Sequence, residues 1–577
     1  MQIFDFFRIK KKIPAPWEKY YTKEELQFSI PDVTVYEQIK EVSLNHPDFI
    51  AINYENVSIT YESLLKKIDI CALSFKKLGV KKGDIITICL PNIPEVLISF
   101  YALNKLGAIG SFIHPLSTAL EIKESIEKTK SKYLITLDSF LKKVKEIIDD
   151  TKLKKVIVVN PTDSLNILLK VGYRIKNITK MEINFYNSKF IRWPIFMLHN
   201  PLVTTDIKII GNKDTPAVIL NSGGTSGKPK YVVIQNRVFI LGAIQEKISL
   251  KQLRERERVL AVMPNFHGFG LSVCMHTPLA LGFTSILVPQ FDAKKFDVLL
   301  NKTKPTAIVG VPTLYEALIN NQNIQDLDLS YVKYAVCGGD VLNKSLEEKI
   351  NNYFLMHNAN VKVSQGYGLT ESLAAVCLAR DDLNKSGSTG IPFPTNHIKI
   401  IDPATRKTKK TNEVGEIVVH SKGLMMGYLN DEVETNTALQ VHQDGHVWLH
   451  TGDLGYMDKD GFIFHKGRIK RMIITSGYNV YPSHIEEIIE KHEAVLQCSV
   501  VGKPHPYKQE VVKAFIVLKE GHQAIKEKSN IKKHCEKYLA KYMVPSEYVF
   551  RKQLPKTKLG KVDFKKLQED SGLDDED

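Results

Sequence analysis

Several features are missing from this sequence of 577 residues, and each absence narrows what the protein can be. No hydrophobic run approaches the ~20 apolar residues that a membrane-spanning helix needs. Residues 1–8 have no basic stretch ahead of an apolar core, so we expect no secretory signal. The seven cysteines form no C-x-x-C pair, and several lie in apolar runs. They are therefore predicted to be buried free thiols in a reducing compartment, which indicates a cytoplasmic protein.

Long basic blocks are also absent, although the formal net charge is +15. The lysines are dispersed along the chain, and no recognisable nucleic-acid-binding motif accompanies them. This pattern is typical of a solvated, lysine-rich surface, so we expect no nucleic-acid partner. A positive field of this size still favours the approach of anionic small molecules.

The two ends of the sequence have unusual compositions. Phe4, Phe6 and Phe7 precede a basic run at residues 10–12, and such a segment can touch an anionic membrane surface. Peripheral membrane contact therefore stays open, but we favour a short tail that docks on the protein itself. Residues 568–577 are acidic and are predicted to form a disordered tail.

The length of the chain indicates more than one domain, because a single core stops growing near ~250–300 residues. Short apolar runs alternate with helix-length segments between residues 48 and 160 and again after residue 215. Such alternation predicts two sheets of parallel strands covered by helices. The predicted strands are 85–90, 111–114, 133–137, 156–159, 259–263, 285–288, 307–311, 332–337 and 361–364, and the predicted helices of the first half are 61–78, 94–106, 119–129 and 140–150.

Three further regions complete the predicted organisation. Residues 161–213 interrupt the alternation and are either a long insertion or an amphipathic surface element. After residue 380 the chain is β-rich with turn signals, and from residue 471 strands and helices mix. We therefore predict an α/β fold. It consists of a large N-terminal domain of two helix-covered sheets plus a β-rich subdomain (1–469), a small α+β C-terminal domain (470–567) and the acidic tail (568–577).

The segment at 219–230 reads Ile-Leu-Asn-Ser-Gly-Gly-Thr-Ser-Gly-Lys-Pro-Lys and concentrates glycines, hydroxyls and lysines in one loop. Glycine allows positive φ and a close approach of backbone N–H groups to a ligand. Successive N–H groups then form an anion-binding concavity. The hydroxyls of Ser222, Thr225 and Ser226 add donors, and two lysines add positive charge. Such a loop is suited to holding a polyphosphate.

Two other interpretations of this loop were weighed. Clusters of Gly, Ser, Thr and Lys are often flexible surface turns. A Walker-type phosphate loop requires G-x-x-x-x-G-K-[ST] followed by a helix. Here only three residues separate Gly223 from Gly227, and Pro229 stands where the magnesium-binding hydroxyl should be. Apolar runs at 217–220 and 231–234 flank the loop, which predicts that it joins two strands.

Six further segments accompany the loop in a fixed order. They are 264–267 (Pro-Asn-Phe-His), 364–371 (Ser-Gln-Gly-Tyr-Gly-Leu-Thr-Glu), 448–453 (Trp-Leu-His-Thr-Gly-Asp), 467–470 (Gly-Arg-Ile-Lys), 476–482 (Ser-Gly-Tyr-Asn-Val-Tyr-Pro) with Glu486, and 554–561 (Leu-Pro-Lys-Thr-Lys-Leu-Gly-Lys). Together with the loop they resemble the signature of the adenylate-forming superfamily, which contains acyl-CoA synthetases, luciferases and the adenylation domains of peptide synthetases. The resemblance covers residues 30–565 and implies that the small C-terminal domain is mobile.

The resemblance implies that ATP and Mg²⁺ bind at these motifs. It assigns to Thr370 a hydrogen bond to the α-phosphate and to Glu371 a bond to Mg²⁺, an ion that prefers oxygen ligands. Without the resemblance, Glu371 would be interpreted as an acid that offsets the dipole at the start of a helix. The β- and γ-phosphates are assigned to Ser222, Gly223, Gly224, Thr225, Ser226, Gly227, Lys228 and Lys230.

The resemblance also implies which residues bind the nucleoside. Tyr367 would stack on adenine, and Gln365 would read its amino edge. Asp453 would accept the ribose hydroxyls, with a turn aspartate as the alternative, and Arg468 would approach the same ribose and phosphate, with a surface ion pair as the alternative. Glycines complete the set: Gly338 and Gly339, which would form a wall of the adenine site although the following Asp340 departs from the small residue common in the family, and Gly366 and Gly368 around the tyrosine.

Lys561 is the residue assigned to adenylation itself. A lysine ammonium is a compact, mobile charge that can neutralise the α-phosphate region. The neighbouring lysines make a solvated surface charge the alternative, but the preceding Gly560 and the Pro-Lys-Thr context single out Lys561.

Many members of the superfamily run a second half-reaction after the small C-terminal domain has rotated, and the resemblance implies the same here. Lys470 would lie at the pivot, and the rotation would withdraw Lys561. Ser476 and Gly477 would then line the passage for the pantetheine arm of CoA, which the serine narrows slightly because glycine is frequent there. His267, together with Phe266, would gate the acyl site; a buried core histidine is the alternative.

The acid substrate is indicated by what the motifs lack. Relatives in the superfamily that activate amino acids carry an Asp near the gate segment, and acetate-specific relatives carry a Trp just before the Thr-Glu pair. The segment at 263–270 contains no acidic residue, and no tryptophan directly precedes Thr370. No carrier-protein domain follows either. A medium- or long-chain fatty acid or an aryl acid therefore fits best, with ATP and CoA as co-substrates. Two alternatives stay open: a ligase that loads the acyl group onto a carrier protein, and a non-catalytic nucleotide-binding relative. The sequence predicts no oligomeric state.

Overall fold

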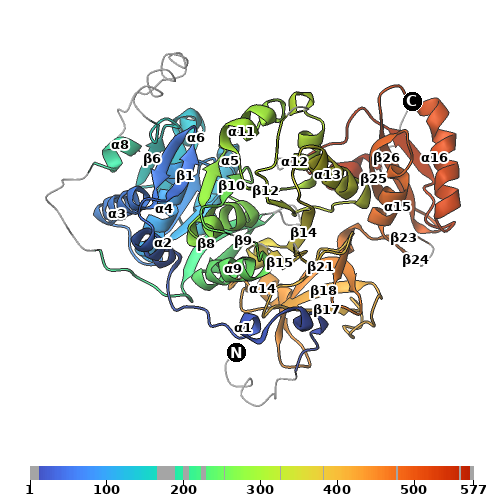
Figure 1. Ribbon diagram of the computed structural model, residues 1–577, viewed down its shortest axis with the longest axis horizontal. Helices are drawn as coiled ribbons and strands as arrows, with labels where there is room; N and C mark the ends of the chain where they lie inside the picture. The colour runs from blue at the N-terminus through green and yellow to red at the C-terminus, as the bar shows by residue number, and fades with distance from the viewer. Residues whose placement is uncertain are drawn as a thin grey trace.

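The computed structural model describes residues 12–165, 189–198, 207–222 and 229–571, apart from 253, 325–326, 374, 381, 476–477 and 558–560. Figure 1 shows two helix-covered sheets, a β-rich layer below them and a separate C-terminal region at one end. The predictions for residues 1–11, which include the membrane-contact segment, lie outside the described residues.

The first sheet is mainly parallel and follows the order β19-β9-β8-β4-β3-β5-β6-β7. Its strands are β3 (Ile85–Cys89), β4 (Ile109–Phe112), β5 (Tyr133–Leu137), β6 (Lys155–Val159), β7 (Phe190–Arg192), β8 (Pro216–Ser222), β9 (Lys230–Gln235) and β19 (Gly427–Tyr428). The four strands predicted before residue 160 are confirmed with shifts of one or two residues. The central strands are buried along nearly their whole length, which is expected of a parallel sheet covered on both faces.

The second sheet has the order β16-β15-β14-β13-β12-β10-β11-β1-β2 and is parallel except at its two edges. Each of the five strands predicted after residue 215 is present in it. The strands of this second sheet are β1 (Ile50–Tyr54), β2 (Val57–Thr60), β10 (Arg258–Ala261), β11 (Thr284–Leu287), β12 (Ala307–Gly310), β13 (Tyr334–Cys337), β14 (Val363–Gly368), β15 (Ala375–Leu378) and β16 (Ile391–Pro392). The sequence interpretation of two related α/β layers is therefore confirmed.

Helices cover both sheets, and several begin at caps that the sequence encodes. Thr34 and Glu37 form a reciprocal capping box at the start of α2, and Thr118 and Glu121 form another at α5, which satisfies backbone donors that have no partner within the helix. The helices are α2 (Val35–Asn45), α3 (Tyr61–Lys77), α4 (Pro94–Lys105), α5 (Ala119–Thr129), α6 (Leu141–Ile147), α9 (Asn236–Ser249), α10 (Thr277–Ala280), α11 (Phe296–Thr303), α12 (Pro312–Ile319) and α13 (Lys344–Met356).

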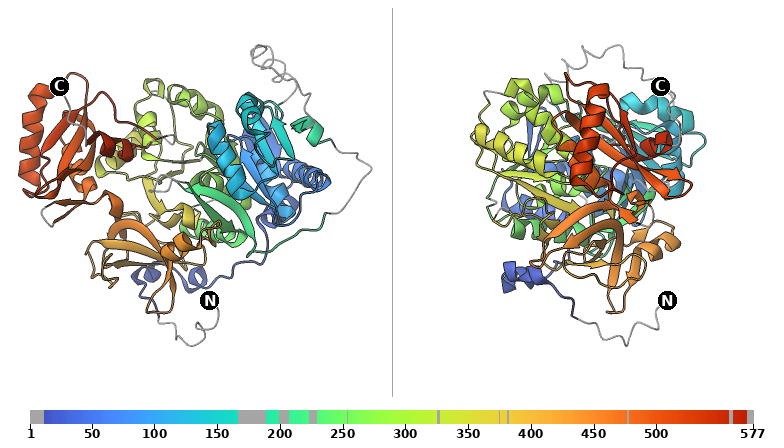
Figure 2. Two further views of the ribbon diagram at one scale, coloured as in Figure 1. Left: turned by 180° about the vertical axis from the view of Figure 1, so that it is seen from behind. Right: turned by 90° about the vertical axis from the view of Figure 1, so that its right-hand side faces the viewer.

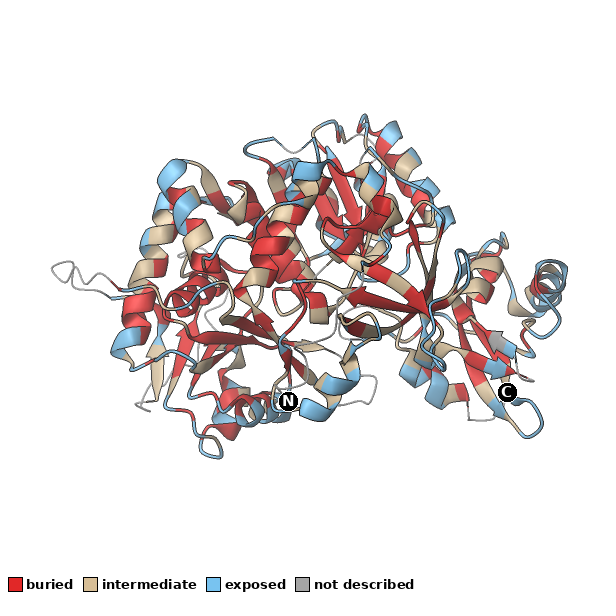
Figure 3. Ribbon diagram, turned by 90° about the horizontal axis from the view of Figure 1, so that it is seen from below, coloured by how far each residue is buried: buried red, intermediate tan, exposed pale blue. Residues whose placement is uncertain are grey.

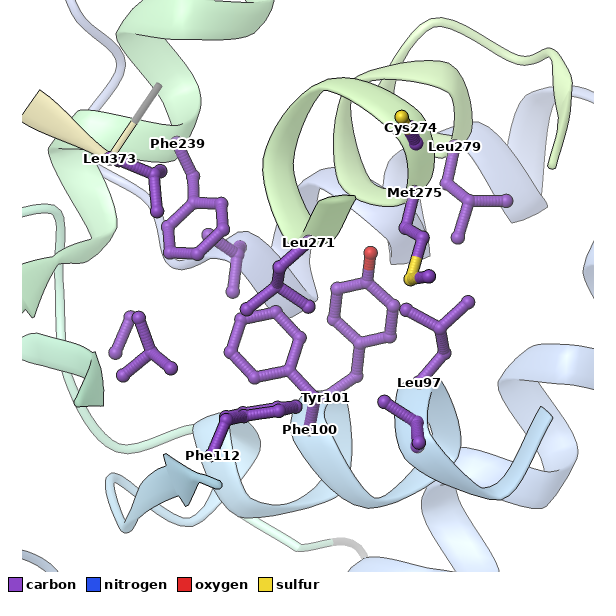
Figure 4. Packing of buried hydrophobic residues seen from close by; sticks show 14 of the residues in the cluster. Leu97, Phe100, Tyr101, Phe112, Phe239, Leu271, Cys274, Met275, Leu279 and Leu373 are labelled. Carbon is purple, nitrogen blue, oxygen red and sulfur yellow. The ribbon is translucent and has the colours of Figure 1, made fainter. Parts of the chain in front are cut away.

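The main core joins the two sheets into one body. Helix α4 is buried at every position, including its polar residues, and a single cluster contains α3, α4 and inward-facing residues of both sheets. Figure 4 shows Phe100 and Tyr101 of α4 packed against Phe112 of β4 and against Leu271, from the helix that follows the 264–267 motif. Figure 3 shows buried sheet strands and exposed outer faces of the helices. The two α/β layers therefore form one continuous hydrophobic unit.

The β-rich layer predicted after residue 380 is present as an antiparallel sheet. It contains β17 (His397–Ile401), β18 (Gly415–His420), β20 (Leu439–Val441), β21 (Val447–Met457) and β22 (Ile463–Arg468), with α14 (Glu432–Ala438) beside it. The N-terminal η2 (Pro16–Tyr20) and α1 (Lys23–Leu26) lie on this layer rather than on the first sheet. Trp17 of η2 is fully buried there with Ile391 and Phe462.

The C-terminal region has a hydrophobic core of its own, centred on Ile485, Val500 and Ile516. The predicted mixture of strands and helices is confirmed, and Figure 2 shows this region projecting beyond the sheets. The exact boundary at residue 470 stays a prediction. The elements are β23 (Ile473–Thr475), α15 (Pro482–Glu490), β24 (Tyr478–Val480), β25 (Val495–His505), β26 (Gln509–Leu518), α16 (Ala524–Tyr538), β27 (Glu547–Phe550) and α17 (Phe564–Ser571).

Two sequence predictions need correction or completion. The predicted start of the acidic tail at residue 568 is wrong, because α17 continues to Ser571, which is fully buried, and Arg551 pairs with Asp570 at 2.7 Å. In the segment 161–213, β7 extends the first sheet and α8 (Trp193–Phe196) buries Trp193. That part of the segment therefore belongs to the body of the fold, and residues 166–188 and 199–206 lie outside the described residues.

All seven cysteines are free and buried, as predicted. Burial raises the pKa of the Cys89 thiol to about 12, so this side chain behaves as a small apolar group. Within the described part of the chain, no helix is long and apolar enough to cross a membrane.

Candidate functional site

The carboxyl ends of β12, β13 and β14 lie side by side at one edge of the second sheet, and they carry several of the predicted residues. Gly338 and Gly339 follow β13 directly. Gly339 has a φ of +77°, a conformation that strains any residue with a Cβ, and a Cβ on Gly338 would come within 3.3 Å of the Gly366 carbonyl. The backbone at the two glycines is therefore not covered by side chains of their own. It lies at the carboxyl end of a strand, where ligands commonly bind in α/β sheets.

The predicted phosphate loop connects two antiparallel strands. Ser222 at the end of β8 pairs with Lys230 at the start of β9, and β9 leads through Gln235 into α9. The strand on each side of the loop confirms the prediction that it joins two strands and excludes the Walker-type arrangement, in which a helix follows the glycines. Residues 223–228, which include Gly223, Gly224, Thr225, Ser226, Gly227 and Lys228, lie outside the described residues.

Lys230 is held by two residues that the sequence analysis did not identify. Its Nζ lies 2.5 Å from Glu434 Oε2 of α14 and 4.8 Å from the centre of the Tyr428 ring of β19. These partners come from the β19–α14 connection, which pairs with β9 only in the folded chain. No motif marks them in the sequence. The assignment of Lys230 to the phosphates stays a prediction, and it requires this cation to be shared with or released by Glu434.

Thr370 and Glu371 lie in η8 (Thr370–Ser372), directly after β14. This single 3-10 turn is too short for the helix-start interpretation of Glu371. Glu371 Oε1 accepts a hydrogen bond from the Tyr428 hydroxyl at 2.8 Å, and its Oε2 has no partner among the described residues. Thr370 is a buried residue, and its side chain makes no hydrogen bond to the described residues. Both side chains therefore keep free bonding capacity at the sheet edge.

Asp453 of β21 is the centre of a second cluster. Its Oδ2 accepts a hydrogen bond from the Tyr367 hydroxyl at 2.7 Å, while Oδ1 lies 3.1 Å from Arg468 Nε and 3.8 Å from His465 Nε2. Burial opposes ionisation of Asp453, but the nearby His465 side chain and the Arg468 charge outweigh it, so the pKa of the carboxyl lies below its ordinary value. The cluster therefore presents a fixed carboxylate.

The structure brings Tyr367, Asp453 and Arg468 together as the sequence analysis expected of one nucleoside site, and it adds His465. The His465 ring lies 5.6 Å from the Tyr367 ring, between centroids. His465 precedes Arg468 by three residues on β22, a spacing with no distinct signal in the sequence. The role of each residue toward a nucleotide stays a prediction.

Gln365 of β14 points its amide at backbone groups. In the orientation that satisfies both ends of the amide, Nε2 donates to the Ser388 carbonyl at 3.0 Å and Oε1 accepts from the Leu342 N–H at 2.9 Å. Recognition of the adenine amino group by this side chain would require it to leave these partners. Gly366 and Gly368 lie in β14 on either side of Tyr367 and pair with β15.

Lys561 reaches from the C-terminal region to the edge of the second sheet. Its Nζ donates a hydrogen bond to the carbonyl of Gly339, and the Thr557 N–H donates a hydrogen bond of 2.7 Å to the Lys561 carbonyl. Burial lowers the pKa of the Lys561 ammonium, whereas the nearby Asp340 and Asp453 act in the opposite direction. This lysine therefore brings a cation from one region to the carboxylate cluster of the other.

His267 lies close enough to Lys561 to respond to its charge. Burial, reinforced by that cation, lowers the pKa of the imidazole to about 4. His267 Nδ1 accepts a hydrogen bond from the Phe269 N–H at 3.3 Å, so the ring is neutral at pH 7 with its proton on Nε2. Next to it, a Cβ on Gly268 would collide with the Leu373 carbonyl. The segment that follows the 264–267 motif is therefore packed directly against the chain at the end of η8.

Of the residues predicted to serve the second half-reaction, the structure describes only Lys470. Lys470 lies in η9 (Ile469–Arg471), between β22 and β23, at the junction of the β-rich layer and the C-terminal region. Ser476 and Gly477 lie outside the described residues.

Comparisons with known proteins were made on sequence and on structure. Residues 39–429 match the family model of the AMP-binding enzyme, and residues 484–561 match that of the AMP-binding enzyme C-terminal domain. A long-chain-fatty-acid–CoA ligase of Bacillus subtilis (strain 168) is 31% identical over 560 residues, which are 96% of this chain and 98% of the relative. The 4-coumarate:CoA ligase 1 of Petunia hybrida is 28% identical over 506 residues, or 86% of each chain.

Solved structures share the fold. An anthranilate CoA ligase, AuaEII, in complex with anthranoyl-AMP aligns with a TM-score of 0.81 at 23% identity, over 94% of this chain and 98% of its own. ATP-bound MatB from Rhodopseudomonas palustris aligns with a TM-score of 0.80 at 21% identity, over 93% and 99%. These likenesses support the α/β architecture and its small C-terminal region.

Proposed function

The chain belongs to the AMP-binding enzyme family, and we propose that it is an AMP-forming acid–thiol ligase. In the first half-reaction a carboxylic acid and ATP form acyl-AMP and release pyrophosphate. In the second, the thiol of CoA displaces AMP to form the thioester.

The contact of Lys561 with Gly339 is the observation that carries this proposal. In this contact an ammonium from the C-terminal region lies at the end of β13, near Asp453 and Arg468 of the β-rich layer and near His267. Adenylation brings an anionic acid to an anionic triphosphate, so fixed positive charge at the reacting phosphorus is the main requirement for catalysis. This conformation supports the adenylation half-reaction.

In that half-reaction the acid carboxylate attacks the α-phosphorus, and the bond to the bridging oxygen of pyrophosphate breaks. Lys561 and Thr370 would stabilise the charge on the α-phosphoryl oxygens. Asp453 would accept the ribose hydroxyls, because a carboxylate kept ionised by Arg468 and His465 binds two O–H donors well. Neutral His267 would fill the space beside the acid without adding a second cation.

The free oxygen of Glu371 fits a hard divalent cation. One carboxylate with remaining water ligands is a common way to bind Mg²⁺ with a nucleotide, and the Tyr428 hydroxyl holds the other oxygen in place. When bound, Mg²⁺ would supply charge neutralisation for the phosphates. The β- and γ-phosphates would lie at the 222–230 loop.

For the thioester step we propose that the C-terminal region rotates about Lys470. Rotation breaks the Lys561 contact with Gly339 and frees the approach to the acyl carbonyl for the CoA thiol. The sulfur–carbon bond then forms as the bond from carbonyl carbon to the AMP oxygen breaks. Ser476 and Gly477 would line the thiol's path.

The acid is proposed to be a medium- or long-chain fatty acid. The relatives named as long-chain-fatty-acid–CoA ligases support it, while the named 4-coumarate ligase keeps aryl acids in the test panel. The free buried thiols support a cytoplasmic location, because a reducing compartment preserves them.

The deciding experiment is acid-dependent exchange of labelled pyrophosphate into ATP with purified protein and Mg²⁺. Exchange with at least one acid supports adenylation, and its absence across fatty and aryl acids would reject the proposal and favour the non-catalytic alternative. Supplying CoA or a phosphopantetheinylated carrier protein to the same reaction then separates the two acceptors, because only the true acceptor gives a thioester.

A further inference from the structure

A small cavity lies directly behind the Thr370–Glu371 turn. Its walls come from α9, from the π-helical η5 (Phe269–His276) that follows the gate segment, and from the chain after η8. Ser372 and Leu373 are shared between the turn and the cavity. Figure 4 shows the apolar packing at its edge, where Leu373 faces Phe239 of α9. A volume of about 20 Å³ gives room for one water-sized group.

The lining is more polar than a hydrocarbon chain requires, and most of its polar groups are satisfied. Gln245 Nε2 donates to the Pro394 carbonyl at 2.7 Å and to Asn396 Oδ1 at 3.1 Å. Asn396 Oδ1 also accepts from the Ser421 hydroxyl at 2.6 Å. These hydrogen bonds form without any ligand.

Glu246, the next residue of α9, takes no part in this network. It is 8% exposed and lines the cavity, and its carboxyl has no hydrogen bond or ion pair among the described residues. Burial raises the pKa of this carboxyl to about 8, so at pH 7 it is mainly protonated and has one donor and one acceptor to offer. A buried polar group left without a partner costs ~1–3 kcal/mol. An unsatisfied carboxyl on a residue that lines a cavity indicates a ligand that completes it.

We propose that this cavity receives a hydroxyl group of the carboxylic acid substrate and that Glu246 selects acids that carry one. The inference rests on the proposed function, since it specifies the acid that the same site activates. A hydroxyl fits the available volume and, like the protonated carboxyl, is both donor and acceptor. An alkyl group in the same place would leave Glu246 unpaired, and an ammonium would require a buried ion pair whose desolvation offsets much of its attraction.

Gly242 of α9 keeps the cavity open. A Cβ at this position would meet nothing closer than the Ser272 hydroxyl, 3.9 Å away, and the helical backbone accepts any ordinary residue there. A valine at position 242 would extend into the cavity without distorting the fold. This position therefore offers a way to fill the cavity while Glu246 stays intact.

The test compares kcat/KM for matched acids of equal chain length, either plain or carrying a hydroxyl at successive positions. The readout is pyrophosphate release with ATP and Mg²⁺. For the wild type we expect one hydroxyl position to be favoured over the plain acid by about tenfold or more, as the unmet hydrogen bonds of Glu246 predict. Glu246→Leu should reduce this ratio to about one or below, chiefly through KM.

Two variants keep the result interpretable. Glu246→Gln preserves size and both hydrogen-bonding functions, so it should keep the hydroxyl preference within about threefold of wild type. Gly242→Val should abolish the preference by filling the cavity. Equal use of plain and hydroxylated acids by the wild type, a preference that survives Glu246→Leu, or a stronger preference for amine-bearing acids would each overturn the inference while leaving adenylation intact. No pyrophosphate release with any acid would overturn the proposed function and this inference together.

Discussion

The large N-terminal part of the molecule and its C-terminal region are each held together by a hydrophobic core. The contacts between the two parts include polar hydrogen bonds. Each has a hydrophobic core, one running through both sheets and one centred on Ile485 and Val500. Between them the contacts include a hydrogen bond of 2.9 Å from Asn343 Nδ2 to Glu490 Oε2, one of 2.6 Å from the Ser483 hydroxyl to the Lys466 carbonyl, and that of Lys561 to Gly339.

This difference separates what must stay fixed from what can move. Breaking an apolar core exposes surface at about 25 cal/mol per Å², whereas a polar contact can be exchanged for water at a net cost of about 0.5–1.5 kcal/mol. The strand ends proposed to position the substrate therefore belong to one continuous core. The cation proposed to serve only the adenylation step comes from the region that we propose rotates.

The largest effect is expected when that cation is removed. Lys561→Ala should lower acid-dependent ATP–pyrophosphate exchange by about a hundredfold or more, because no other group in the C-terminal region reaches Gly339 in the described structure. Thioester formation from supplied acyl-AMP and CoA should stay within a few-fold of wild type. Lys565→Ala is the matched control, since Lys565 is exposed on α17 nearby. Equal loss of both half-reactions would reject the assigned role.

A proline at the proposed pivot should have the opposite pattern. Lys470→Pro fixes φ in η9 and should slow thioester formation about tenfold or more while changing pyrophosphate exchange only a few-fold. Lys470→Ala, which leaves the backbone free, is the control for lost charge. If exchange suffers more than the thioester step, residue 470 is not the pivot.

Within the large region, Tyr428 is expected to position Glu371 rather than to take part in the reaction. Tyr428→Phe removes the 2.8 Å hydrogen bond to Oε1 and should raise the Mg²⁺ concentration for half-maximal exchange several-fold, with a smaller change in the maximal rate. Tyr456→Phe is the control, because the Tyr456 ring stacks on Phe464 in the β-rich layer, whereas Tyr428 belongs to β19 of the first sheet. An unchanged Mg²⁺ dependence would contradict this positioning role.

The smallest effect concerns Glu490, which accepts the hydrogen bond from Asn343 between the large region and the C-terminal region. Burial raises the pKa of Glu490 from 4.5 to about 7, so the folded state binds more protons than the unfolded state between these values. The contribution of Glu490 to stability is therefore present below pH 4.5 and is lost as the pH rises toward 7.

Glu490→Gln should remove this pH dependence. We expect the variant to gain stability relative to wild type by on the order of 1 kcal/mol between pH 4.5 and 8, measured as the difference in free energy of unfolding at each pH. Other buried carboxyls affect both proteins equally and cancel in the difference. Parallel curves for the two proteins would show that Glu490 is not buried at the joint as described.

The sequence predicted more of the fold than of the contacts within the site. The strands of both parallel sheets and the hairpin around the phosphate loop were evident from short apolar runs, because buried strands need continuous apolar sequence. The capping boxes at Thr34 and Thr118 are likewise local. By contrast, the end of α17 (568–571) was interpreted as part of a disordered tail, since the packing that buries Ser571 is not visible in the acidic composition there.

Residue identity along the chain therefore determined the order of the elements, the family motifs and the candidate chemistry of Glu371, Asp453 and Lys561. Only the tertiary structure decided that Tyr428 holds Glu371, that His465 lies beside Asp453, and that the unpaired Glu246 lines a cavity behind the Thr370–Glu371 turn. Motifs and periodicity are local properties of a chain, whereas these pairs join elements whose proximity depends on sheet register and helix packing. No local pattern records which polar group is left without a partner once the core has closed around it.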